Sequence, residues 1–117
     1  MIAFRVFLLV MFVSVAAFTA VTTANHGIDV LPIFFGDMMK MTWPGQFNFD
    51  FSCFLIMSGL WVSWRHNFSI GGVLLGVVAA FGGALFLSMY LLVQSFLQDG
   101  DVAALMLGSK RAQQLRA

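Results

Sequence analysis

The chain has 117 residues, of which 61% are hydrophobic and only 9% are charged, and its formal net charge is +1. An ordinary soluble domain carries about 25% charged residues, and a chain this short cannot bury so much apolar surface by itself. We therefore expect lipid to be the solvent for most of the molecule. The low charge argues against a nucleic-acid-binding surface, which needs clustered basic residues.

Three apolar runs are long enough to cross a bilayer, which takes about 20 apolar residues. They cover residues 2–24, 46–64 and 70–96. Backbone groups inside a bilayer have no water to bond, so each run is expected to be a helix. The sequence thus predicts an all-α membrane protein, with residues 1–117 forming one integral membrane domain with three transmembrane helices. A cleaved signal peptide is the alternative for the first run, although the run is longer than the typical signal core of about 7–15 residues.

The loop between the first two runs contains an apolar segment, residues 31–43, that is too short to span. Pro32 suits the first turn of a helix, and the segment has an apolar side while Asp37 and Lys40 are polar. This pattern predicts a short helix in the membrane interface. The apolar side would be formed by Leu31, Phe34, Phe35, Met38 and Trp43.

The remaining connections are simpler. The link at residues 65–69 is tight, so the second and third spans are expected to be antiparallel neighbours. The C-terminal tail, residues 98–117, is polar and is expected to form a short surface helix at residues 102–107 followed by a frayed end.

At 100° per residue, the second span has two opposite faces. One face carries the small residues Ser52, Gly59 and Ser63. The other carries Asp50, Cys53, Met57, Trp61 and Trp64, with Cys53 interpreted as a small core hydrophobe.

The third span has a similar stripe of small residues, formed by Gly72, Gly76, Ala79 and Gly83. Small residues at this spacing predict close helix packing. The contact could be with the other spans of the same chain. It could also be with a partner membrane protein, or with a second copy through the glycine-rich third span.

Aromatic and basic residues near the span ends predict how the chain sits in the bilayer. Trp43, Trp61, Trp64 and Arg65 are interpreted as interface anchors. With three spans, Arg5 and Arg65 share one side, while the other side carries Lys40, Lys110, Arg111 and Arg116. The count favours the second side as cytoplasmic, but Arg5 and Arg65 directly flank their spans. On that proximity we predict a bacterial inner-membrane protein with its N-terminus inside.

Three spans would bring the end of the first, the start of the second and the end of the third to one side. The candidate polar cluster there comprises Asp50, Tyr90, Gln94, His26, Asp29 and Thr19. In the structural interpretation Asp50 is a carboxylate near a helix start, where the helix dipole favours an anion. In the functional interpretation Asp50, His26 and Tyr90 form a small site for a proton, an ion or a lipid headgroup. His26 and His66 would lie at opposite ends of the spans, so no metal site, cofactor or catalytic residue is predicted.

A run of short motifs supports a family resemblance. His26-Gly27-Ile28-Asp29, then Phe34-Phe35, then Asp50 and a span end at Trp61 to Arg65 resemble a bacterial domain-of-unknown-function family of three-helix integral membrane proteins of similar length. The matching stretch covers residues 27–65. The family has no established activity to transfer. The resemblance implies three helices, and that His26, Asp29 and Asp50 belong together.

These observations favour a non-enzymatic accessory or packing subunit of a larger membrane complex, because no catalytic constellation accompanies the glycine-striped, aromatic-rich helices. The alternative is a small oligomeric transporter or channel protomer. Against that alternative, no span shows a proline or glycine break near its middle that faces polar groups, as transporter sites often do. The third hypothesis is a lipid- or quinone-handling protein that uses Asp50, His26 and Tyr90.

Overall fold

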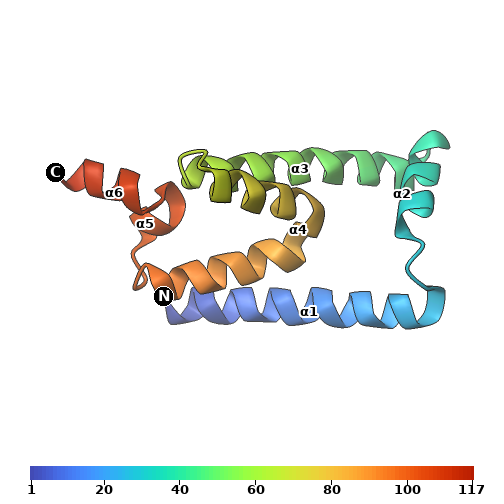
Figure 1. The fold of residues 1–117 in the computed structure, drawn as a ribbon. Helices are drawn as coiled ribbons and strands as arrows, with labels where there is room; N and C mark the ends of the chain where they lie inside the picture. The colour runs from blue at the N-terminus through green and yellow to red at the C-terminus, as the bar shows by residue number, and fades with distance from the viewer.

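The computed structural model describes residues 1–117 as six helices without a strand, and 85% of the chain is helical (Figure 1). The expected all-α fold is therefore confirmed. In chain order the helices are α1 (Ile2–His26), α2 (Val30–Met39), α3 (Trp43–Arg65), α4 (Ile70–Leu97), α5 (Val102–Leu107) and α6 (Ser109–Arg116).

Two helices, not three, have the length and hydropathy of a membrane span. These are α1 and α4, with 25 and 28 residues. The 23-residue α3 is nearly as long, but polar side chains lower the hydropathy of its first half. Those side chains are Gln46, Asn48, Asp50 and Ser52. The prediction of three comparable spans is wrong in this respect, because it counted the length of α3 and gave its polar first half too little weight.

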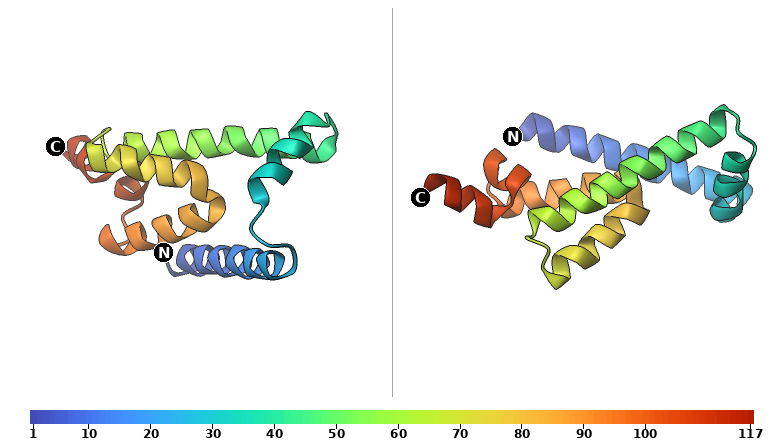
Figure 2. Two further views of the ribbon diagram at one scale, coloured as in Figure 1. Left: turned by 45° about the vertical axis from the view of Figure 1, so that its right-hand side comes forward. Right: turned by 90° about the horizontal axis from the view of Figure 1, so that it is seen from above.

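Helix α4 reverses direction at Gly83. The backbone there has φ 58° and ψ −146°, a conformation that is accessible to glycine but strained for residues with a Cβ. The first arm (residues 70–82) runs along α3, and the second arm (residues 84–97) returns beside α1 (Figures 1 and 2). Each arm is about 20 Å long at 1.5 Å per residue. The expected single straight helix over residues 70–96 is therefore a helical hairpin.

The first arm packs closely on the small-residue face of α3. A Cβ placed on Gly59 would lie 2.6 Å from the Gly76 carbonyl oxygen, so the two backbones touch at this point. Val62 and Ala79 are fully buried beside the contact. Of the small residues expected to support helix packing, Gly59 and Gly76 thus face each other within one chain, whereas Gly83 forms the reversal of α4.

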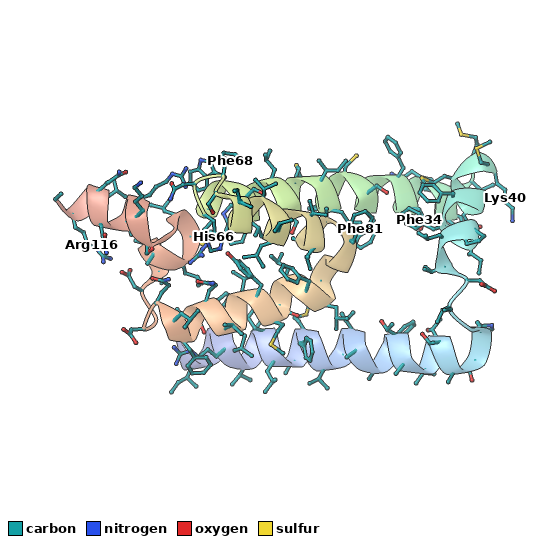
Figure 3. The ribbon with its side chains drawn as sticks, in the orientation of Figure 1. Phe34, Lys40, His66, Phe68, Phe81 and Arg116 are labelled. Atoms are coloured by element: carbon teal, nitrogen blue, oxygen red, sulfur yellow. The ribbon has the colours of Figure 1, made fainter.

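The second arm packs on the N-terminal part of α1, where Leu8 is buried. Helix α1 makes no comparable contact with α3. Phe81, at the tip of the hairpin, is 85% exposed (Figure 3). Phe18, further along α1, is 77% exposed. The hairpin therefore covers only one half of the length of α1 and α3.

Helix α2 runs across the ends of α1 and α3 (Figure 1). The Asn48 side-chain amide donates a hydrogen bond of 3.0 Å to the Phe34 carbonyl and ties α2 to α3. The predicted interfacial segment, residues 31–43, thus appears as a helix at Val30–Met39. At the opposite end of the molecule, the tail forms α5 as expected. The end predicted to be frayed instead forms a second helix, α6.

Candidate functional site: a buried arginine at the end of α3

The predicted polar cluster is divided between the two ends of the molecule. Asp50, His26, Asp29 and Thr19 lie towards the α2 end, where all four are exposed and no side-chain hydrogen bond joins them. Tyr90 and Gln94 lie at the opposite end and are buried. The prediction that these six residues gather is therefore wrong. The prediction fails because α4 reverses direction at Gly83, so that the end of α4 returns to the side of the molecule on which this helix began.

Asp50 also lies deeper in its helix than expected. Helix α3 begins at Trp43, so Asp50 is in its third turn, and the favourable dipole of a helix N-terminus falls off within the first turn. Cys53, one turn further on, is exposed. The interpretation of Cys53 as a core hydrophobe is wrong, because this face of α3 points away from α2 and α4.

The main polar constellation is built around Arg65, the last residue of α3, which is only 3% exposed. Its Nε donates to the Leu105 carbonyl at 2.7 Å and its Nη2 to the Ala104 carbonyl at 3.0 Å. These acceptors lie in the last turn of α5, where helix carbonyls carry partial negative charge, and the Ala104 carbonyl also accepts from the Gly108 N–H. The Arg65 guanidinium is therefore bound by a helix C-terminus and not by a carboxylate.

Tyr90 and His66 complete this constellation. Arg65 Nη1 donates to Tyr90 Oη at 3.1 Å, and Tyr90 Oη lies 2.5 Å from His66 Nε2. Because the tyrosine oxygen already accepts from Arg65, its own proton can be donated to a neutral His66. Desolvation by burial, together with the positive charge of Arg65, lowers the pKa of His66. Both effects favour the neutral imidazole.

The tail holds the end of α3 through further contacts. Trp61 Nε1 donates to the Met106 carbonyl at 3.1 Å. The Arg111 guanidinium lies 4.0 Å from the centre of the Trp64 ring and donates to the Trp64 carbonyl. With Arg65, three of the four predicted interface anchors are therefore in contact with the tail, whereas Trp43 is exposed at the other end of α3.

A second arginine joins α1 to the end of α4. Arg5 donates to the Ser95 hydroxyl at 3.0 Å through Nε and to the Ser95 carbonyl at 2.8 Å through Nη2. Its guanidinium also lies 3.9 Å from the centre of the Phe96 ring. The N-terminus, the hairpin ends and the tail are thus fastened together at one end of the molecule.

This chemistry is that of a structural connection. All three nitrogens of the Arg65 guanidinium already bind groups of the chain. No group of three or more His, Cys, Asp or Glu side chains could hold a metal ion. A depression of about 480 Å³ lies elsewhere, between α2 and the start of α3, and no ionisable side chain lines it.

Sequence reasoning missed this constellation because it treated Arg65 as an interface anchor. One usable signal is the pair Gly100 and Gly108, which flank α5 and have positive φ angles of 73° and 91°. Glycines at such positions permit the sharp turns that carry the tail back over α3.

Comparison of the chain with models of known protein families, with curated proteins and with solved structures finds no match. The resemblance to a family of three-helix membrane proteins therefore stays a prediction.

Proposed function

We propose that the chain is a multi-pass membrane protein in which α1 and α3 cross the bilayer and α4 enters as a helical hairpin. Helices α1 and α3 are about 35 Å long or more at 1.5 Å per residue, against a hydrocarbon core of about 30 Å. Both run between the same two ends of the molecule and cross obliquely when seen from above (Figures 1 and 2), so in this arrangement a bilayer crossed by α1 also contains α3. Neither arm of α4 is long enough to cross alone.

This arrangement supports an orientation. Five of the six Lys and Arg residues lie at the end that carries both termini, and Lys40 alone lies at the α2 end. Figure 3 labels Arg116 and Lys40 at these opposite ends. Cytoplasmic loops carry an excess of Lys and Arg. The proposed orientation has both termini in the cytoplasm and α2 lying in the opposite interface, which fits a bacterial inner membrane.

Within that bilayer, the chain acts as a non-enzymatic subunit of a larger membrane assembly. One observation carries this proposal: the hairpin stops at Gly83, so the α2-side halves of α1 and α3 have no third helix between them. Helix association in a bilayer depends on close side-chain packing, and α1 and α3 make no such contact with each other. A helix of another protein would complete it.

The hairpin also bears on the alternative, an oligomeric transporter or channel. Gly83 provides the mid-helix break that the sequence analysis did not anticipate, and broken helices are typical of transporter sites. However, the side chains nearest to Gly83 are Phe51 and Leu55, so the break faces apolar groups.

The lipid- or quinone-handling hypothesis loses its geometric support, because Tyr90 lies at the opposite end from Asp50 and His26.

Native mass spectrometry of the particle extracted in mild detergent from the membranes of the native host tests the proposal. A complex that contains this chain and a different membrane protein in fixed ratio is the expected result. A particle that contains only copies of this chain would favour the oligomeric transporter. A monomer would refute the subunit proposal.

A further inference from the structure

One face of α3 is directed away from the rest of the chain. It carries Gln46, Asp50, Cys53 and Met57, which follow one another at helical spacing and which we call the outer stripe. All four side chains are exposed. They lie opposite Asn48 and Gly59, the side on which α2 and α4 pack. Gln46 borders the depression beside α2, and the rest of the outer stripe has no partner within the chain.

Asp50 makes this stripe chemically unusual. It forms no ion pair or side-chain hydrogen bond, whereas Asp37 and Asp101 pair with Lys40 and Arg116. It lies about 10 Å along α3 from Trp43, at 1.5 Å per residue, and so inside the apolar band if α3 crosses the bilayer. Ionised side chains in membrane spans almost always face other protein groups that compensate them. A carboxylate facing lipid would lack such compensation.

At the α2 end the only cation of the chain is Lys40, which lies 3.9 Å from Asp37. The guanidinium groups of Arg5, Arg65 and Arg111 are bonded at the opposite end. A second copy packed on the same stripe by a two-fold axis along the membrane normal would place Asp50 against Asp50. Two carboxylates at such a contact repel each other unless one is protonated.

Resting on the proposed subunit function, we infer that the outer stripe docks a transmembrane helix of a different protein that carries a Lys or Arg side chain at the level of Asp50. The exposed rings of Phe47 and Phe54 border Asp50 on the same helix. They supply apolar contact on either side of the ion pair. The small Cys53 side chain, one turn away, allows the partner helix to approach closely.

The test uses the full chain in the membranes of its native host. A photo-reactive phenylalanine analogue replaces Cys53, the cross-linked product is isolated, and mass spectrometry identifies the linked residue. The expected product joins this chain to a membrane helix of another protein, within one turn of a Lys or Arg. Asp50→Leu is expected to reduce its yield about tenfold, as interhelical polar contacts of 1–2 kcal/mol would require.

Two variants keep this test informative. Asp50→Asn preserves the shape of the side chain and is expected to reduce the yield, while Ile56→Leu, an exposed position of α3 outside the outer stripe, should leave it unchanged. A product of two copies of this chain, a product with lipid, or a yield that Asp50→Leu and Asp50→Asn do not change would overturn the inference. If native mass spectrometry still shows a hetero-complex in that case, the proposed function stands and only the docking surface is wrong.

Discussion

Replacing Gly83 by alanine should destabilise the hairpin of α4. At φ 58° and ψ −146°, a residue with a Cβ pays about 1–3 kcal/mol in backbone strain. The added Cβ would also lie 3.1 Å from Phe51 Cζ, which is tighter than ordinary contact. In a straight α4 the same substitution is favourable by about 1 kcal/mol. Gly83→Ala thus shifts the balance from hairpin towards straight helix by about 2–4 kcal/mol, which is a factor of about 30 or more.

The two forms differ in where the chain ends. In the proposed arrangement the hairpin leaves both termini on one side of the membrane, whereas a straight α4 would carry the tail to the other side. Single cysteines introduced as Ile2→Cys or Ala117→Cys, in a Cys53→Ala background, can be labelled with a membrane-impermeant maleimide in right-side-out and inverted vesicles. We expect both termini on the same side in the parent chain, and part of the C-termini on the opposite side in Gly83→Ala.

Gly71→Ala is the matched control, because Gly71 lies in the same helix and a Cβ there meets no atom within 4 Å. It should leave the labelling pattern unchanged. Termini found on opposite sides in the parent chain would refute the hairpin. Equal behaviour of Gly83→Ala and Gly71→Ala, in labelling and in thermal stability, would refute the argument from backbone strain.

Three further predictions concern stability in detergent. Arg65→Met should lower the free energy of unfolding by about 3–5 kcal/mol, since hydrogen bonds to a charged group contribute about 1.5–3 kcal/mol each. Arg65→Lys should lower it by less. Equal stability of Arg65→Met and the parent would contradict the role of the network. Gly76→Ala should lower the free energy of unfolding by about 1–3 kcal/mol through overpacking against Gly59, as measured by chemical unfolding. An unchanged free energy of unfolding would show that the two helices can move apart without cost. The lowered pKa of His66 means that the unfolded chain binds more protons below pH ~6.5. Thermal stability should therefore be full above that pH and decline as the pH falls through the lower folded-state pKa. His66→Asn should remove this decline, and an unchanged pH profile in the variant would assign it to another group.

Sequence patterns located the helices of this chain well. Apolar runs at residues 2–24, 46–64 and 70–96 correspond to α1, α3 and α4 within a few residues at each end. These patterns are local in sequence, and the formation of a helix depends mainly on the residues within that helix. The two faces of α3 were also predictable, because helical periodicity fixes which side chains share a face.

The polar constellation was not predictable in the same way. Gly83 lies in a glycine-rich apolar run, where small residues are equally compatible with the packing face of a straight helix. The sequence around Gly83 therefore does not reveal that its φ angle is positive. That single backbone angle decides the end of the molecule at which Tyr90 lies. The network around Arg65 also needs the tail to return, and such a contact between residues 40 positions apart has no local signature.

The reversal at Gly83 also determines how much polar chain must be moved through the membrane during insertion. In the proposed orientation, the only connecting segment beyond the bilayer is residues 27–42, with the charged side chains Asp29, Asp37 and Lys40. Two acids and one base give this segment a net charge of −1. The hairpin itself adds no further translocated loop, since its tip is apolar. Translocation of one short, weakly charged segment would be enough for the whole protein to insert into a bilayer. The basic C-terminal tail would remain on the cytoplasmic side, where the chain is synthesised.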